Sequence, residues 1–274
     1  MKALIFAAGL GTRLKPYTDT MPKAMVPING KPMLWHQVQR LKAAGVDSLV
    51  INVHHFADQI IDYVQSQDGF GMNVQFSDER GCLLDTGGGL LHARSFLEGE
   101  GEPFLIHNVD IFSNLDLGAF IADGLGAGTL AKLLVSDRDS SRKLLFNAHR
   151  ELCGWKNLKT GELRGPAADA AASAASGAAS GAVASAEASA LPALDELAFG
   201  GVHLVSPAIF KVFDAINAQY TSVGKETPFI GSFGIIDFYL AACRNNRISA
   251  YIQPGLTLID AGKPEALQHC SELL

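Results

Sequence analysis

This sequence of 274 residues is short of positive charge, of cysteine and of long apolar runs. Its 22 Lys and Arg residues are outnumbered by 28 Asp and Glu residues, which leaves a net charge of -6 at pH 7. A general nucleic-acid binder needs a basic face to meet phosphates, so this balance argues against one while leaving room for a local basic pocket. No run approaches the ~18 apolar residues that a membrane span requires. We therefore expect neither nucleic acid nor a membrane as a partner.

The few cysteines are scattered along the chain and form no CxxC pair: Cys82, Cys153, Cys243 and Cys270. Their spacing argues against a disulfide framework and against a zinc site, and it fits a reducing cytosol. A cytoplasmic location is therefore expected. No arrangement of Ser, His and Asp that would indicate nucleophilic catalysis is recognisable. None of these features indicates the oligomeric state.

The apolar start of the chain, ALIFAAGL, could be mistaken for a short signal peptide. The run is brief, however, and Gly11, Thr12 and Arg13 interrupt it at once. A buried first strand that enters a glycine loop is the better interpretation.

Apolar runs alternate with helix-period stretches along most of the chain. Buried strands are expected at 3–8, 48–53, 72–77, 104–109, 129–135 and 197–205. Helices are expected at 33–44, 56–67, 207–218, 235–243 and 263–273. This alternation predicts an α/β fold: a Rossmann-like, doubly wound, mostly parallel mixed sheet with helices on both faces.

One stretch, 166–193, breaks the pattern because it is almost entirely Ala, Ser and Gly. Alanine favours helix, but serine and glycine dilute that preference and no apolar stripe is present to pack against a core. We expect a flexible surface insertion or, alternatively, a frayed helix.

The segment 7–28, AAGLGTRLKPYTDTMPKAMVPI, leaves the first expected strand and is rich in small residues. Gly9 and Gly11 let backbone N–H groups approach phosphate oxygens, and Arg13 and Lys23 add the positive charge that a triphosphate needs. On the residues alone, an ordinary strand-to-loop turn with surface basic residues explains the segment equally well.

A dinucleotide-binding loop is a poorer explanation of the same glycines. The third glycine of G-x-G-x-x-G is missing, and Pro16, Pro22 and Pro27 punctuate the stretch where a helix should begin. A cofactor bound at a helix N-terminus is therefore not expected.

The longer segment LIFAAGLGTRLKPYTDTMPKAMVPINGKPML resembles the N-terminal signature of sugar-1-phosphate nucleotidyltransferases. Within that family it is most similar to N-acetylmuramate-1-phosphate uridylyltransferases and to mannose-1-phosphate guanylyltransferase-like enzymes. Family members usually have proline after the signature lysine, whereas this chain has Ala24. The resemblance extends over nearly the whole chain on both sides of 166–193, so it implies a single nucleotidyltransferase domain over 1–274 with that stretch as an insertion.

In the family this loop holds the nucleoside triphosphate. The resemblance therefore assigns nucleotide binding to Ala8, Gly9, Gly11, Thr12, Arg13 and Lys23. Arg13 and Lys23 would also be the catalytic cations.

A second motif, DTGGGL at 85–90, resembles the family's Glu-Thr-Gly-Gly-Gly segment, with Asp85 in place of the glutamate. Three consecutive glycines suit a flat base or sugar lying against backbone, although a flexible loop is the general alternative. The resemblance implies that Gly87 and Gly88 contact the nucleotide and Gly89 the sugar. We expect backbone groups at these glycines and at Ala8 to bond the base edge.

Two aspartates match the family's metal ligands. Asp110 follows an expected strand, where parallel sheets place ligand sites and where a lone aspartate is otherwise commonly a cap. Asp260, in LIDAGKPEAL, matches the aspartate of a Trp-x-Asp-x-Gly-Thr-Pro segment, with Leu258 and Lys263 replacing Trp and Thr. Mg²⁺ is the implied cofactor because it prefers oxygen ligands and takes one or two carboxylates. The pairing of the two aspartates follows from the resemblance alone.

Sugar contacts are also implied by the match. Asn108 survives from the family's Asn-Gly-Asp, in which Val109 replaces the glycine, and Gly201 matches its Phe-Ser-Gly. Arg142 or Lys143 is a candidate for the sugar-phosphate contact. His54 and His55 are expected to pack or hydrogen bond rather than bind metal.

The resemblance implies a magnesium-dependent transfer of a nucleotidyl group, UTP first, to a sugar 1-phosphate, with release of pyrophosphate. The product would be an NDP-sugar, and N-acetylmuramate 1-phosphate, a precursor for the cell envelope, is the first expectation for the sugar. Alternatives are a GTP-dependent mannose- or heptose-1-phosphate guanylyltransferase, a phosphocholine cytidylyltransferase and a catalytically silent nucleotide-binding regulator.

Overall fold

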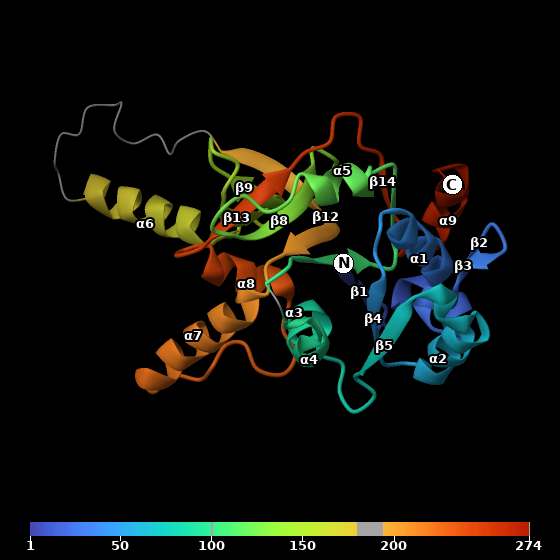
Figure 1. Cartoon of the computed structure of the whole chain (residues 1–274). Helices are drawn as coiled ribbons and strands as arrows, with labels where there is room; N and C mark the ends of the chain where they lie inside the picture. The colour runs from blue at the N-terminus through green and yellow to red at the C-terminus, as the bar shows by residue number, and fades with distance from the viewer. Residues whose placement is uncertain (100, 180–193, 274) are drawn as a thin grey trace.

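A mixed β-sheet runs through the protein, with helices packed on both of its faces (Figure 1). The computed structural model describes residues 1–99, 101–179 and 194–273. Within these residues no helix is both long and apolar enough to cross a membrane.

The strands occur throughout the described chain. They are β1 (Lys2–Phe6), β2 (Pro27–Ile28), β3 (Lys31–Pro32), β4 (Ser48–Val53), β5 (Asn73–Asp78), β6 (Phe104–Asn108), β7 (Ile111–Ser113), β8 (Thr129–Ser136), β9 (Arg142–Phe146), β10 (Leu152–Asn157), β11 (Leu163–Arg164), β12 (Asp195–Val205), β13 (Arg247–Tyr251) and β14 (Leu258–Asp260).

The α-helices lie between these strands and after the last of them. They are α1 (Met33–Ala43), α2 (Ala57–Ser66), α3 (Asp85–His92), α4 (Arg94–Leu97), α5 (Leu117–Ala122), α6 (Pro166–Ala179), α7 (Ala208–Ser222), α8 (Ile235–Ala242) and α9 (Pro264–Leu273). Short 3-10 turns complete the set: η1 (Thr12–Leu14), η2 (Tyr17–Asp19), η3 (Lys23–Met25) and η4 (Asp68–Gly71).

The main sheet changes character half-way across. Strands β6, β1, β4 and β5 are neighbours and run parallel, whereas β12 pairs antiparallel with β6, β8 and β9. The first half therefore has the strand–helix alternation of a doubly wound fold. Its carboxyl ends, the expected place for a ligand, are the ends of β1, β4, β5 and β6.

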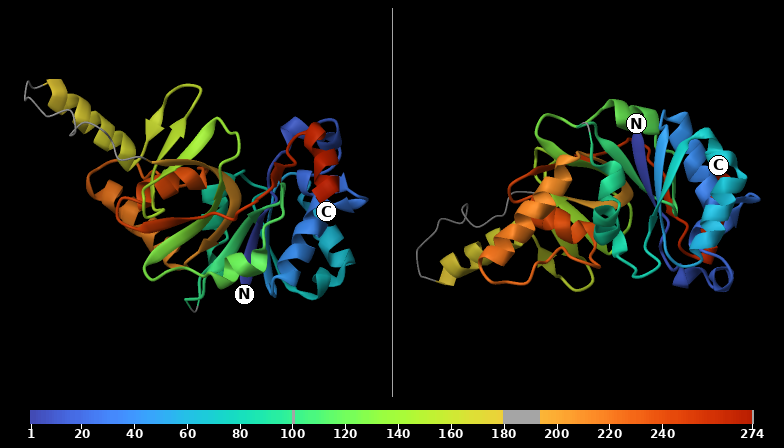
Figure 2. Two further views of the ribbon diagram at one scale, coloured as in Figure 1. Left: turned by 90° about the horizontal axis from the view of Figure 1, so that it is seen from above. Right: turned by 60° about the horizontal axis from the view of Figure 1, so that its bottom comes forward.

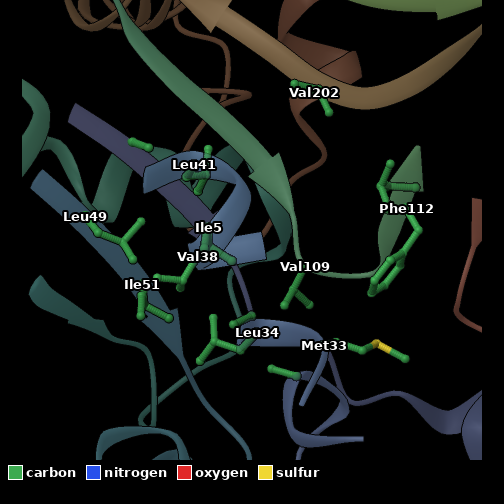
Figure 3. Close-up of a cluster of buried hydrophobic side chains, with 14 of the residues drawn as sticks. Ile5, Met33, Leu34, Val38, Leu41, Leu49, Ile51, Val109, Phe112 and Val202 are labelled. Atoms are coloured by element: carbon green, nitrogen blue, oxygen red, sulfur yellow. The ribbon is translucent and has the colours of Figure 1, made fainter. Parts of the chain in front are cut away.

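Buried apolar side chains form one cluster on each face of the sheet. In the first, Ile5 and Ile51 of the sheet pack under Leu34 and Val38 of α1, as Figure 3 shows. In the second, side chains of α3, α4, α7 and α8 cover the opposite face, with Phe213 and Phe238 stacked 3.7 Å apart between ring centroids. Figure 2 shows these two helical layers with the sheet between them.

The predicted fold class is confirmed, and the predicted strands and helices lie within a few residues of the observed ones. The parallel pairings, however, are concentrated in the first half, because β12 runs antiparallel to β6, β8 and β9, although β13 pairs parallel with β8. The single-domain prediction stays a prediction.

The stretch 166–193 is only partly described. Its first half is helix α6, which projects from the sheet in Figure 1 and is anchored by the buried Ala167 and an ion pair between Asp169 and Arg244. Residues 166–179 therefore form a helix, which agrees with the helical alternative, whereas the flexibility of this insertion stays a prediction. The rest of the insertion, 180–193, lies outside the described residues.

Candidate active site

The loop after β1 is folded tightly around Lys23. Gly11 has φ +64°, and a Cβ on it would lie 2.8 Å from Thr18 Cγ2 and 3.0 Å from Lys23 Cβ. The Thr18 hydroxyl donates a 2.9 Å hydrogen bond to Gly11 O, which closes the loop. Only glycine adopts this left-handed backbone readily and leaves room for the Thr18 and Lys23 side chains. Gly11 therefore lets the loop fold back over Lys23.

A small ribbon outside the main sheet brings the two predicted metal ligands together. Strand β7 directly follows Asp110 and pairs antiparallel with β14, with Asp260 opposite Ile111. The Ala261 N–H donates a 2.8 Å hydrogen bond to Asp110 O, which fixes the register at the end of the ribbon. The pairing of Asp110 with Asp260, which had followed only from resemblance, is therefore present in the fold.

Each carboxylate of this pair has a cation beside it. Lys23 Nζ donates to Asp110 Oδ2, and both of these side chains are largely buried. Arg13 Nη2 lies 3.6 Å from Asp260 Oδ2 in a more exposed pair. All four predicted charged residues thus meet at one place.

The two aspartates differ in electrostatic environment. Burial raises the pKa of Asp110, and the neighbouring Asp260 raises it further. The positive charge of Lys23 lowers this pKa, but the net shift is upward. Partial burial opposes ionisation of Asp260 too, but the Gly262 N–H and the charges of Lys23 and Arg13 hold its pKa below the ordinary value. The site therefore concentrates negative charge that only nearby cations balance.

This pair suits a magnesium ion. Mg²⁺ is held in nucleotide sites by one or two carboxylates, with substrate phosphates and water as the other ligands. Within the described residues no cluster of three or more His, Cys, Asp or Glu side chains could hold a metal. Asp110 and Asp260 would therefore supply the protein's share of the ligands.

A cavity of about 330 Å³ opens beside this centre at the carboxyl ends of the parallel strands. It is lined by the predicted residues Ala8, Gly9, Lys23, Asn108 and Asp110, and also by Phe6, Asn52, Glu79, Leu83, Asp85, Thr86, Val109 and Ser232. This position agrees with the general placement of ligand sites in parallel sheets.

Asn52 and Glu79 form a buried pair that sequence reasoning missed. Asn52 Oδ1 accepts the N–H groups of Ala7 at 2.6 Å and Ala8 at 3.1 Å, and its Nδ2 donates to Glu79 Oε1 at 2.8 Å. The second oxygen, Glu79 Oε2, accepts the Leu84 N–H at 3.3 Å. Desolvation raises the pKa of Glu79. One feature of the sequence could have indicated this pair: Asn52 is the lone asparagine in the apolar strand SLVINV. A buried polar side chain requires hydrogen-bond partners, so a partner such as Glu79 is expected nearby.

The three glycines of DTGGGL lie inside helix α3 rather than in a loop before it. The N–H groups of Gly87 and Gly88 donate to Phe233 O at 2.8 and 3.2 Å, and that of Ala8 is held by Asn52. In this structure these N–H groups are therefore engaged by the protein itself, and the expectation that backbone at Gly87, Gly88 and Ala8 bonds a base edge stays a prediction. A ligand role for Gly87 and Gly88 stays a prediction.

These glycines allow close packing of α3. A Cβ on Gly87 would lie 2.3 Å from the Phe233 ring, one on Gly88 2.1 Å from Gly231 O, and one on Gly89 2.8 Å from Glu79 Oε1. The segment around Phe233 is tied to α3 at two further points, Phe233 N to Leu84 O and Ile235 N to Thr86 Oγ1. The glycines thus bring 231–235 up to the cavity, where Ser232 forms part of the wall.

A second, larger cavity of about 940 Å³ adjoins the first at Asp85 and Thr86, which line both. Asp260 and Arg13 lie in its wall, so the aspartate pair connects the two cavities. Its other charged lining residues are Arg138, Arg142, Glu162, Arg164 and Asp237. Two joined cavities with carboxylates between them can hold two substrates whose reacting groups meet.

Of the remaining predicted residues, some line a cavity and others do not. Arg142 lines the larger cavity, whereas Lys143 is buried and donates to Arg138 O at 2.8 Å. Gly201, with φ +70°, lies at a bulge in β12, where a Cβ would be 3.0 Å from Asn108 Nδ2, and it lines neither cavity. His54 Nδ1 shares a 2.7 Å hydrogen bond with Glu79 O, as expected for a packing role.

Comparison with known proteins identifies the family to which this arrangement belongs. The sequence model of the family described as nucleotidyl transferase matches residues 2–140, which include the glycine loop, Lys23, the DTGGGL helix and Asp110. The chain belongs to the nucleotidyl transferase family. Asp260 lies beyond the matched part of this nucleotidyl transferase, and the β7–β14 ribbon and the ion pair with Arg13 connect it to the rest of the site.

Curated relatives of this nucleotidyl transferase include two kinds of enzyme. An N-acetylmuramate α-1-phosphate uridylyltransferase from Caulobacter vibrioides is 44% identical over 110 residues, 39% of this chain and 45% of the relative. A probable mannose-1-phosphate guanylyltransferase from Arabidopsis thaliana is 36% identical over 147 residues, 52% of this chain and 40% of the relative. The chain thus spans about half the length of the curated relatives that it matches.

Solved structures share the fold over the whole chain. A glucose-1-phosphate thymidylyltransferase described as putative, from Bacillus anthracis, superposes with a TM-score of 0.70 at 17% identity, covering 100% of this chain and 94% of that chain. A UDP-glucose pyrophosphorylase complexed with UDP-glucose gives a TM-score of 0.70 at 18% identity, covering 99% and 97%. At such low identity these similarities establish the fold alone.

Proposed function

We propose that this protein transfers a nucleotidyl group from a nucleoside triphosphate to a sugar 1-phosphate and releases pyrophosphate. The observation that carries the proposal is the meeting of Asp110 and Asp260 between two joined cavities, with Lys23 and Arg13 beside them. The smaller cavity, beneath the glycine loop, would hold the nucleotide, and the larger one the sugar phosphate.

Mg²⁺ bound by Asp110 and Asp260 would neutralise charge on the phosphate oxygens and hold the two substrates in register. The reaction is an in-line displacement. An oxygen of the sugar 1-phosphate attacks the α-phosphorus of the triphosphate, the bond from that phosphorus to the β-phosphate oxygen breaks, and pyrophosphate leaves with the bonding electrons. No covalent intermediate with the protein is required.

The chain's own residues act by charge and position. Lys23 and Arg13 would offset the charge that develops on the leaving pyrophosphate, and Asn52 would fix the loop by holding the Ala7 and Ala8 N–H groups. Holding two bound anions in the reacting orientation lowers the activation free energy and accounts for a large share of the rate enhancement in such reactions. The four charged residues are all present, which argues against a catalytically silent regulator.

UTP is the proposed nucleotide and N-acetylmuramate 1-phosphate the proposed sugar, because relatives of that specificity match this chain. GTP with a mannose-type 1-phosphate is the second candidate, supported by the guanylyltransferase relatives. A cytoplasmic enzyme that makes a cell-envelope precursor would fit the first candidate.

Pyrophosphate release measured over a grid of nucleotides and sugar 1-phosphates, with saturating magnesium, tests the proposal. Turnover with at least one pair, abolished by EDTA, is expected. A kcat/KM at least tenfold higher for GTP or CTP than for UTP would overturn the uridylyl assignment and leave the transfer reaction standing. No release from any pair, with the protein folded, would overturn the transfer reaction itself.

A further inference from the structure

The larger cavity contains more positive charge than the proposed reaction uses. Four arginines line it, and two of them have carboxylate partners. Arg13 pairs with Asp260, and Arg164 donates to Asp237 Oδ1 at 2.7 Å while its guanidinium lies 4.2 Å from the Trp155 ring centroid. Arg13 therefore belongs to the aspartate pair at one end of the cavity. Arg164 is held in the cavity wall by its contacts with Asp237 and Trp155.

The other two arginines, Arg138 and Arg142, pair with no carboxylate among the residues that the structure describes. Arg138 Nη2 donates to Phe199 O at 3.1 Å, whereas its buried Nε has no hydrogen-bond partner. A buried guanidinium donor left without an acceptor is costly, and a planar guanidinium suits a carboxylate or phosphate in a bidentate contact.

Local structure favours an anion at this place. Arg138 lies just after β8 and Arg142 begins β9, so the turn between these strands presents both side chains to one cavity, with the Ser140 and Ser141 residues between them. Lys143, beneath the turn, donates to Arg138 O and lies 3.7 Å from the exposed Asp137. The turn thus carries three cations against the two acids Asp137 and Asp139, and neither of its arginines forms an ion pair among the described residues.

We propose that Arg138 and Arg142 form a subsite for a second anionic group on the sugar substrate, a carboxylate or a phosphate remote from the 1-phosphate. This inference rests on the proposed function. The 1-phosphate must lie beside Asp110 and Asp260 in order to react, where Arg13 is already available. A neutral hexose ring would offer the two arginines no charged acceptor, whereas an acidic sugar would offer one.

Matched sugar 1-phosphates test the proposal. N-acetylglucosamine 1-phosphate and N-acetylmuramate 1-phosphate differ only in a lactyl ether that carries a carboxylate. A second series varies the group at C6. Glucose 1-phosphate has a neutral hydroxyl there, glucuronic acid 1-phosphate a carboxylate, and glucose 1,6-bisphosphate a phosphate. These arms separate a carboxylate subsite from a phosphate subsite. For the wild type, kcat/KM should be higher with at least one acidic sugar than with its neutral counterpart.

The variants Arg138→Gln, Arg142→Gln and the double variant should lose on the order of 10- to 100-fold in kcat/KM with the preferred acidic sugar, the range expected for hydrogen bonds to a charged group. With the neutral counterpart they should stay within about threefold of the wild type by the same reasoning. Arg150→Gln, at an exposed arginine outside both cavities, is the matched control, and melting temperatures report folding.

Equal losses with acidic and neutral sugars would assign the arginines to the 1-phosphate and overturn the proposal. A wild type without preference for any acidic sugar would overturn it as well. If no sugar supports turnover, calorimetric binding of N-acetylmuramate 1-phosphate still decides. Weaker binding by the double variant supports the subsite, and equal binding overturns it, independently of whether the transfer reaction is correct.

Discussion

Lys23 is a buried partner of Asp110 as well as the cation closest to the proposed nucleotide. Its side chain is 12% exposed, and that of Asp110 is 15% exposed. Removing the lysine therefore affects both the reaction and the balance of charge at the metal pair. The two effects can be separated by measuring rate and stability on the same variant.

Lys23→Ala should lower kcat/KM by about 10²–10³, the typical cost of losing one preorganised charge contact in the transition state. Steady-state pyrophosphate release gives this value. The melting temperature should also fall, because Asp110 is left without its cation, and added magnesium should restore part of it. A variant within threefold of the wild type would remove Lys23 from the reaction.

Asp260→Asn should abolish magnesium-dependent turnover while leaving the β7–β14 ribbon in place. The amide is a poorer ligand for Mg²⁺ than a carboxylate, whereas the Gly262 N–H can still donate to its carbonyl oxygen. Turnover is followed against magnesium concentration, with Asp116→Asn, on the N-cap of α5, as a carboxylate control outside both cavities. Normal magnesium dependence of the Asp260 variant would separate Asp260 from the metal.

At the scale of elements, apolar periodicity predicted the parallel strands of the first half, β8, β12 and most of the long helices, but not β9, β10, β11 or β13. Helix α3 escaped prediction because DTGGG has poor intrinsic helix propensity, which tertiary packing overrides. The ribbon of β7 and β14 also escaped, because each strand has only three residues and pairs with a distant partner. Local pattern cannot show such a pairing.

Gly88→Ala should destabilise the protein, although alanine is the better helix former. The gain of about 1 kcal/mol in helix propensity is outweighed by a Cβ 2.1 Å from Gly231 O, a backbone atom that cannot turn aside. Overpacking of this kind typically costs about 1–3 kcal/mol. Urea unfolding measures the difference.

Gly81→Ala is the control, because a Cβ there meets nothing within 4 Å. Its free energy of unfolding should change by no more than about 1 kcal/mol. If Gly88→Ala is as stable as the wild type, the contact between α3 and the 231–235 segment is looser than described.

At the scale of the whole molecule, the sequence pointed to most of the charged site but not to its surroundings. Arg13, Lys23 and Asp110 lie in one matched stretch of chain, so resemblance could find them. Asn52 and Glu79 are held by each other across neighbouring strands, and Arg138 stands out because its buried Nε has no hydrogen-bond partner. Such relations exist only once the sheet has formed.

Two histidines buried on the sheet couple stability to pH. Desolvation lowers the pKa of His107 and of His203 to about 3, against an ordinary value of 6.5. The folded protein keeps both neutral, while the unfolded chain binds a proton at each below about pH 6.5. Stability should therefore fall as the pH drops from about 6.5 toward 3, by up to about 1.4 kcal/mol per pH unit for each histidine.

Urea unfolding at pH 7.5, 6 and 5 checks this slope. His203→Phe should flatten it even though the Tyr239 hydroxyl loses its hydrogen-bond partner and overall stability drops. His149→Gln, at an exposed histidine, should leave the slope unchanged. A slope that is the same in all three proteins would exclude His203 as its source.

The β7–β14 ribbon joins Asp110 to an aspartate synthesised much later. The parallel strands at whose ends the smaller cavity lies precede β14 in the chain, so during translation Asp110 and Lys23 are made before Asp260. Nucleotide could bind such a nascent chain, but the second carboxylate would be missing until β14 emerges and pairs. Under the proposed function, a chain that ends before β14 would therefore contain Lys23 and Asp110 but only half of the proposed metal site.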